Sequence, residues 1–343
     1  MLRVENILYI TTPGAWVHLD HDTVKVEIDQ QTRLQAPLIH IGGITCFGNV
    51  ALSSAILQRC AEEGRPVVLM DQRGRFKARV SGPTSGNVLL RRAQHQAHDD
   101  PDRTREIARN VVAGKLQNSR RVLLRAARES TDPDDSALLS DAAQRIALTI
   151  QRLQHATTLE QVRGHEGEGA RRYFGAFHAM VRADRTVFEF SGRVRRPPIG
   201  RINALLSFLY AMLLNDCVAA VEAVGLDPQV GFLHRLRPGR PALALDLMED
   251  LRAYAADRLV LTLVNRGQLR ANDFEILPGG AARLSDSARK AVIVAWQQRK
   301  QDEVRHQLLG RTLPLGLVPL VQAQMLARHL RSDLESYPPF LVR

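Results

Sequence analysis

One histidine and two acids lie close together in residues 225–252, GLDPQVGFLHRLRPGRPALALDLMEDLR. Asp246 and Glu249 are three residues apart in a run whose leucines recur at helical spacing, so both carboxylates share one face of the predicted helix. His234 ends a short apolar segment, and residues 235–241, with two prolines and a glycine, turn the chain between histidine and acids. An imidazole and two carboxylates brought together by a turn predict a divalent-metal site.

The same pattern also fits a packed histidine beside a solvated acidic helix face, because charge clusters are often structural. The flanking residues favour a functional interpretation. Four arginines surround the acids: Arg235, Arg237, Arg240 and Arg252. Metal-binding acids beside arginines that bind phosphate suit an enzyme acting on a nucleic-acid backbone.

A third acid, Glu166, lies in a glycine-rich part of a predicted helix. Residues 157–160 (TTLE) have the form of a capping box, and we expect a helix from there to about residue 181. Each glycine inside a helix costs about 1 kcal/mol relative to alanine, but it lets another backbone or a substrate come close. The glycines are Gly164, Gly167 and Gly169, and the nearby arginines are Arg163, Arg171 and Arg172. Glu166 is our candidate for a third acidic ligand, although these residues alone fit a solvent-facing glutamate better.

The composition predicts a soluble protein with a polyanionic partner. The 343 residues are enough for two domains, and 45% hydrophobic with 24% charged residues is typical of globular proteins. A net charge of +11 and a pI of about 10.3 indicate nucleic acid first and an anionic membrane surface second. The excess is mostly arginine, which favours bidentate phosphate contacts. Only 5% of residues are aromatic, so a base-stacking platform is not favoured.

The cysteines and the apolar runs predict a cytoplasmic protein. Cys46, Cys60 and Cys217 are scattered and odd in number, which argues against a disulfide framework or a zinc ribbon. The N-terminus lacks the apolar core of a signal peptide. The longest apolar run, residues 204–214, is too short to span a membrane.

Two domains are predicted to position these residues. Residues 1–85 form a β-rich domain with strands at 6–11, 23–29, 37–41, 66–70 and 76–80 and one helix at 53–63. Residues 82–86 (GPTSG) form a linker. Residues 86–343 form a larger, all-helical domain interrupted by a hairpin near 273–284. The fold class is therefore α+β, with the candidate site in the helical domain.

Three motifs carry a family resemblance: HEGEGARRYF (165–174), RRPPIGRINALLSFLYAMLLND (195–216) and the segment 225–252. Over essentially the whole chain, the sequence resembles the CRISPR-associated integrase of the adaptation module, the metal-dependent endonuclease common to nearly all CRISPR antiviral systems. The sequence of residues 239–252 is similar to that of the type I-C branch. Gly200 and Arg201 depart from the family's pattern, which has an acid and a proline there.

The resemblance implies a small N-terminal β domain, an all-helical catalytic domain and a set of metal ligands. Carried onto this sequence, the ligands of Mg²⁺ or Mn²⁺ are Glu166, His234 and Glu249, with Asp246 as the neighbouring acid. Some family members have aspartate at position 249, so which acid is the primary ligand stays open. Six arginines become candidates for phosphate contacts: Arg163, Arg171, Arg172, Arg237, Arg240 and Arg252.

The implied activity is insertion of short duplex DNA fragments as new spacers into a repeat array. A 3′-hydroxyl of the fragment attacks a phosphodiester at the edge of a repeat, and hydrolysis follows when water replaces the hydroxyl. The implied partners are double-stranded DNA, a second copy of the chain, and a small ferredoxin-like subunit that bridges two dimers. We expect the β domain to form the dimer surface because it carries no catalytic group.

Two other functions remain open from the sequence. A structure-specific nuclease on branched DNA or RNA would need the same metal site and basic surface. A non-catalytic nucleic-acid-binding scaffold would need only the charge. A membrane-surface protein is disfavoured because the arginines do not gather beside an amphipathic anchor.

Overall fold

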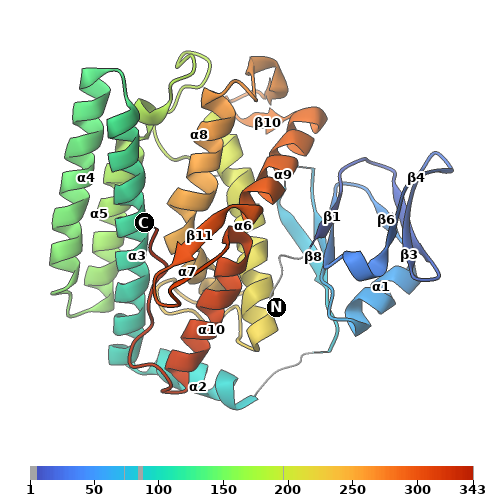
Figure 1. The fold of residues 1–343 in the computed structure, drawn as a ribbon, viewed down its shortest axis with the longest axis horizontal. Helices are drawn as coiled ribbons and strands as arrows, with labels where there is room; N and C mark the ends of the chain where they lie inside the picture. The colour runs from blue at the N-terminus through green and yellow to red at the C-terminus, as the bar shows by residue number, and fades with distance from the viewer. Residues whose placement is uncertain (1–5, 73, 84–87, 196, 343) are drawn as a thin grey trace. The chain divides into compact units, whose positions relative to one another are not determined.

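The computed structural model describes residues 6–72, 74–83, 88–195 and 197–342. The chain forms two compact units, one of residues 1–85 with 289–293 and the other of residues 86–288 and 294–343. The expected linker at 82–86 lies partly outside the described residues. With 54% helix and 16% strand, and a β-rich region before a helical one, the predicted α+β class is confirmed (Figure 1).

The N-terminal unit contains two four-stranded sheets. The first has the order β1 (Ile7–Ile10), β5 (Gly43–Phe47), β7 (Val67–Met70) and β8 (Phe76–Val80), parallel except for β8. The second has the order β4 (Gln31–Pro37), β3 (Thr23–Ile28), β2 (Trp16–Asp20) and β6 (Ala51–Leu52), antiparallel except for the β2–β6 pair. The helix α1 (Ser54–Glu62) starts at the predicted place, where Ser53 caps it.

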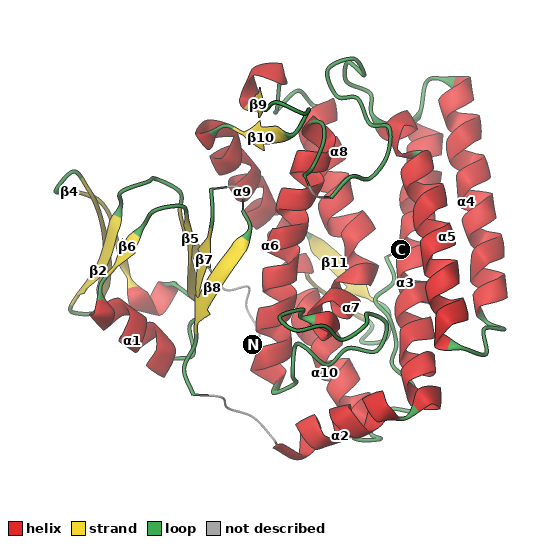
Figure 2. Cartoon of the chain, turned by 180° about the vertical axis from the view of Figure 1, so that it is seen from behind, coloured by secondary structure: helices red, strands yellow, loops and turns green. Residues whose placement is uncertain are grey.

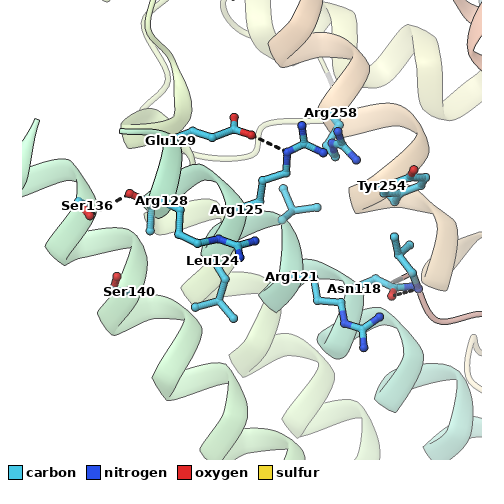
Figure 3. Close-up of a pocket in the computed structure, with 13 residues that line it drawn as sticks. Asn118, Arg121, Leu124, Arg125, Arg128, Glu129, Ser136, Ser140, Tyr254 and Arg258 are labelled. Carbon is cyan, nitrogen blue, oxygen red and sulfur yellow. Dashed lines mark hydrogen bonds and ion pairs between the residues drawn. The ribbon is translucent and has the colours of Figure 1, made fainter. Parts of the chain in front are cut away.

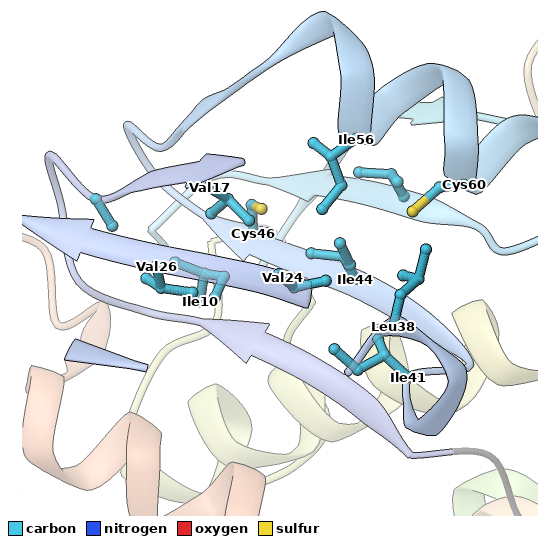
Figure 4. Close-up of a cluster of buried hydrophobic side chains, with 12 residues drawn as sticks. Ile10, Val17, Val24, Val26, Leu38, Ile41, Ile44, Cys46, Ile56 and Cys60 are labelled. Atoms are coloured by element: carbon cyan, nitrogen blue, oxygen red, sulfur yellow. The ribbon is translucent and has the colours of Figure 1, made fainter. Parts of the chain in front are cut away.

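Both sheets and α1 share one apolar core (Figure 4). The predicted alternation in β3 is observed, since Val24 and Val26 are buried between more exposed neighbours. The strand predicted at residues 37–41 is wrong. Strand β4 ends at Pro37, and the 3₁₀ helix Leu38–His40 follows, closed by the N–H of Ile41 donating to the carbonyl of Leu38 at 2.9 Å.

The second unit is mainly helical. Its helices are α2 (Val88–Asp99), α3 (Pro101–Glu129), α4 (Pro133–Leu153), α5 (Leu159–Gly175), the 3₁₀ helix η2 (Phe177–Met180), α6 (Arg201–Val224), α7 (Ala242–Leu251), the π-helical turn η3 (Arg252–Asp257), α8 (Arg258–Asn265), α9 (Asp286–Gln301) and α10 (Val318–Leu330), with short 3₁₀ turns at Ala271–Asp273 and Leu315–Leu317. Helix α3 packs against α4, α5 and α7, and α6 packs against α7 and α10. In both cartoon views α3, α4 and α5 run side by side (Figure 2).

This unit contains more strand than the one hairpin predicted. The expected hairpin is present as β9 (Phe274–Ile276) and β10 (Ala282–Leu284). A second hairpin, β11 (Glu303–His306) and β12 (Arg311–Pro314), follows α9 and was not predicted. Buried and exposed residues alternate along β11, as they do in a strand with one buried face: Val304 and His306 are buried, and the residue before each is exposed.

Helix α5 begins one residue later than predicted and ends earlier. Thr158 is the N-cap, and Gln161 completes the capping box. The helix stops at Gly175 instead of continuing to residue 181, because the chain tightens into η2. Of the three glycines, only Gly169 makes a close approach: a Cβ there would lie 2.1 Å from Cδ2 of the buried Leu116 on α3, whereas Gly164 and Gly167 have nothing within 4 Å.

Helix α6 is the central apolar helix of this unit. By length and composition its 24 residues would suffice to cross a membrane, but 56% of their most apolar stretch is buried inside the protein. Helix α6 packs against α7 and α10, as a helix in the hydrophobic core does. Gly200 precedes it at φ 80° and ψ 160°, a conformation open almost only to glycine, which accounts for glycine at this departure from the family's pattern.

The end of the described chain is attached to α3 through Asn118. The Asn118 amide donates to the carbonyls of Asp250 and Phe340, each at 2.7 Å, and its oxygen accepts from the N–H of Val342 at 2.9 Å. One buried side chain thus links α3, α7 and the C-terminal segment.

Buried Asp257 joins η3 to α6. The Tyr210 hydroxyl donates to it at 2.6 Å. Burial raises the pKa of Asp257 to about 6, because the hydrogen bond from Tyr210 and the charge of Arg252 offset the desolvation only in part.

We predict that Gly169→Ala lowers the free energy of unfolding by about 1–3 kcal/mol, because the new methyl group would have to displace the buried Leu116 side chain. Gly164→Ala and Gly167→Ala should instead raise it by up to about 1 kcal/mol through helix propensity. Urea unfolding of the three variants gives the comparison. Equal effects at all three positions would contradict the close packing of α5 on α3.

We also predict a pH-dependent stability difference between the wild type and Asp257→Asn. The folded-state pKa of Asp257 lies above its ordinary value, so its protonated form stabilises the fold at low pH and that stabilisation is lost as pH rises through about 6. Between about pH 4 and 7, the free energy of unfolding of the variant should therefore rise by about 3 kcal/mol relative to that of the wild type. Tyr210→Phe, which removes the donor to the carboxylate, should move this window to higher pH. A constant difference across the range would contradict the assignment.

Candidate active site

Helix α7 places Asp246 and Glu249 on one face, as their spacing predicted. Both are almost fully buried, at 2% and 3% exposure. They do different things. Asp246 faces the preceding loop, whereas Glu249 faces α3, α5 and His234.

The Asp246 carboxylate accepts four hydrogen bonds from one short segment. The backbone N–H groups of Phe232, Leu233 and His234 donate at 2.6, 3.0 and 3.0 Å, and the His234 Nδ1 lies at 2.6 Å. Gly231 makes this possible, since a Cβ there would lie 2.6 Å from both Asp246 Oδ2 and the backbone of Ala242. The GFLH segment is therefore folded directly onto the first turns of α7.

This arrangement fixes the histidine tautomer. The Nδ1–H of His234 donates to the Asp246 carboxylate, so the Nε2 carries a lone pair. The Nε2 points to Glu249, whose Oε1 is 3.7 Å away. A carboxylate behind a histidine in this way orients metal-binding imidazoles. Asp246 is thus the positioning acid, and Glu249 is the acid beside the reactive side of the ring.

Glu166 reaches the same point from α5. Its carboxylate contacts the ammonium of Lys115 on α3, and that ammonium lies 2.8 Å from Glu249 Oε2. The structure therefore places Glu166 and Glu249 on either side of Lys115, a residue that the sequence did not point to, and places His234 beside Glu249.

Two cations control the electrostatics of Glu249. Burial alone would raise its pKa, but the charges of Arg252 and Lys115 outweigh burial and hold the pKa well below the usual range. Arg252 donates to Oε1 at 2.7 Å and lies over the Tyr210 ring at 4.3 Å. The two cations therefore favour the ionised form of Glu249, which a cation ligand requires.

A divalent cation fits the chemistry of this donor set. An imidazole nitrogen and carboxylate oxygens suit Mn²⁺ or Mg²⁺, and the buried Glu249 Oε2 makes no well-aligned hydrogen bond. The donors are not yet arranged around a single point: among the described residues, no three His, Cys, Asp or Glu side chains form a metal-binding group. The ammonium of Lys115 lies between the two glutamates instead.

A cleft of about 580 Å³ opens beside His234, and its lining includes Arg105, Arg163 and Arg235. Arg163 donates to the Leu233 carbonyl at 2.8 Å and so also supports the GFLH segment. Of the other predicted phosphate contacts, Arg171, Arg172 and Arg237 are exposed and Arg240 is partly buried. Arg252 is mostly buried against Glu249. Phosphate contact stays a prediction for all six.

A larger groove of about 770 Å³ lies away from these acids, along the C-terminal half of α3 (Figure 3). Its lining includes Arg121, Arg125, Arg128, Arg258 and Tyr254. Its one acidic lining residue, Glu129, pairs with Arg125 and Arg182. The groove offers a basic surface but no set of ligands or nucleophiles like that around His234.

Comparison with known families identifies the fold. The family model described as "CRISPR associated protein Cas1" matches residues 8–298. The chain belongs to the Cas1 family.

Relatives in this family align over nearly the whole chain. The CRISPR-associated endonuclease Cas1 1 of Moorella thermoacetica is 55% identical over 98% of both chains. The Cas1 2 protein of Rhodospirillum rubrum is 49% identical over 99% of both. Among solved structures, a Cas1 protein of Thermotoga maritima has a TM-score of 0.81 at 21% identity and covers 95% of this chain and 96% of its own. A casposase bound to its integration product has 0.83 at 23%, with 97% and 92% covered.

We predict that Asp246→Asn destabilises this Cas1 family member by about 2–4 kcal/mol. An amide offers one acceptor oxygen where the carboxylate has two, so at least two buried N–H donors lose their partner, at about 1–3 kcal/mol each. Asp141→Asn, in an exposed pair with Arg145, is the matched control and should change stability by less than about 0.5 kcal/mol. Equal effects of the two substitutions in urea unfolding would contradict the role of Asp246.

Proposed function

We propose that this Cas1 family member is a divalent-metal-dependent DNA endonuclease and integrase that inserts short duplex DNA fragments into a CRISPR array. The observation that carries the proposal is that His234 Nε2 lies 3.7 Å from Glu249 Oε1 and that Lys115 joins Glu249 to Glu166, with an arginine-lined cleft beside His234. The names of the relatives, CRISPR-associated endonucleases, support nuclease activity. The casposase neighbour, bound to an integration product, supports strand transfer.

The reaction is a phosphoryl transfer. The 3′-oxygen of the incoming fragment forms a new bond to phosphorus at the repeat edge, and the bond from phosphorus to the repeat strand's own 3′-oxygen breaks. A cation held by Glu166, His234 and Glu249 supplies Lewis-acid stabilisation of the charge that develops on the phosphate oxygens.

The chain's own residues orient this chemistry. Asp246 holds the His234 ring with Nε2 towards Glu249, and Arg252, which lies over the Tyr210 ring, donates to Glu249 and favours its ionised form. Arg163 and Arg235 line the cleft beside His234, where guanidinium groups can bind neighbouring phosphates in pairs of hydrogen bonds. The basic groove along α3 adds positive surface for a longer stretch of DNA backbone.

The proposal extends to partners, cofactor and location. We assign double-stranded DNA as substrate, Mg²⁺ or Mn²⁺ as cofactor, and a homodimer formed through the N-terminal β unit. A small ferredoxin-like adaptation subunit bridges two such dimers, and the assembly works in the cytoplasm as part of a type I-C system. Solved neighbours at the level of fold include a Cas6-RT-Cas1–Cas2 complex, with a TM-score of 0.83. A Cas1–DNA complex is also among them, with a TM-score of 0.57.

The test is a strand-transfer assay with a supercoiled plasmid bearing the repeat, a short duplex, the partner subunit and Mg²⁺ or Mn²⁺. We predict that the wild type joins the duplex to the repeat edge and that His234→Ala reduces joining by at least about 100-fold. His155→Ala, at an exposed position just after α4, is the control and should keep wild-type joining.

The outcomes separate the candidate functions. Metal-dependent cutting without joining would favour a structure-specific nuclease. DNA binding with neither cutting nor joining would favour a non-catalytic scaffold. Joining that survives His234→Ala would place the active site elsewhere.

A further inference from the structure

The feature that the proposed mechanism does not use is Lys115. It is 8% exposed, which is rare for a lysine unless its charge is paired. Its partners are two acids from two other helices, Glu166 on α5 and Glu249 on α7. A single ammonium thus joins α3 to both carboxylates of the candidate metal site.

The position of this ammonium conflicts with that of a bound metal. The carboxylate oxygens it contacts are the ones that a divalent ion would need, and two cations within about 3 Å of each other repel strongly in a buried site. Arg252 presents no such conflict, because it binds the other oxygen of Glu249 from the side of Tyr210. Lysine is also the cationic side chain with a flexible stem and a compact charge, so it can leave the site without a change in α3.

We propose that Lys115 is a built-in counter-cation that holds Glu166 and Glu249 together in the metal-free protein and moves away from them when a divalent cation binds. It keeps the buried carboxylate of Glu249 and the partly exposed carboxylate of Glu166 close together without the repulsion they would otherwise have. It also sets the metal affinity, because binding must replace the ammonium. This inference rests on the metal site of the proposed function.

The matched control is Lys300. It is equally buried, at 6% exposure, and its ammonium pairs with Asp216 at 3.0 Å, but it lies on α9 outside the candidate site. Any general effect of metal or of losing a buried lysine should appear at Lys300 as well.

The first measurement uses the wild-type protein, so it does not depend on a variant that folds. Metal-free protein is titrated with Mn²⁺ by calorimetry, and lysines are then labelled with a small amine-reactive reagent with and without saturating Mn²⁺. Quantified by mass spectrometry, labelling of Lys115 should increase several-fold on metal binding, while that of Lys300 stays constant. Unchanged or reduced labelling of Lys115 at saturating Mn²⁺ would overturn the inference.

The second measurement compares Lys115→Met with Lys300→Met. Lys115→Met should bind Mn²⁺ on the order of tenfold more tightly than the wild type, with a lower Tm without metal and a larger rise in Tm on adding it. Lys300→Met should keep the wild-type affinity and metal-induced rise. Equal or weaker binding by Lys115→Met would show that the lysine does not compete with metal.

Mn²⁺ binding to the wild type distinguishes the counter-cation role of Lys115 from the metal-dependent function. Binding of Mn²⁺ without a response at Lys115 would overturn only the counter-cation role. Absence of Mn²⁺ binding to the wild type would overturn the metal-dependent function together with it.

Discussion

The candidate site depends on one buried carboxylate, that of Asp246. An ionised acid inside a protein is costly unless its oxygens are fully hydrogen-bonded. Here three consecutive backbone N–H groups and the His234 ring supply the donors. The loop before α7 is therefore held by a set of directed hydrogen bonds and not by packing alone, and the same interaction sets the orientation of the imidazole.

The charges around Glu249 are close to balance. The cluster contains Glu166, Asp246 and Glu249 against Lys115 and Arg252. Such groups must be brought from water into a buried space at the same time, and each needs an opposite charge there to offset the loss of hydration. Helices α3, α5 and α7 contribute one or more of these charges each, so their mutual packing and the charge balance depend on each other. The tight contact of Gly169 with Leu116 keeps α5 close enough to α3 for Glu166 to reach Lys115.

The sequence predicted the parts of this site that follow from local geometry. The spacing of Asp246 and Glu249 puts both on one helix face wherever a helix forms, and the turn after His234 is signalled by proline and glycine. The distinct roles of the two acids could not be predicted, because Asp246 binds backbone groups whose positions no residue type encodes. Lys115 was missed because it is 51 residues from Glu166 and resembles any lysine on an amphipathic helix. In the N-terminal unit, β5 is buried along its whole length and shows no polar alternation in sequence. The apolar residues at 37–41 resembled a strand, but the structure forms a 3₁₀ turn there with Ile39 exposed.

The hydrogen bonds of Asn118 fix the position of α3 relative to α7 and the C-terminal segment, and so fix the spacing of the site. Lys115 faces the acids, and one turn later Asn118 holds α7 and residues 340–342. An extra residue between them would rotate one of the two away by about 100° and shift it by about 1.5 Å. Insertions and deletions in the course of evolution should therefore be excluded from this turn of α3. They should gather instead in exposed connections such as residues 235–239, where a change in length leaves the spacing of the buried groups intact.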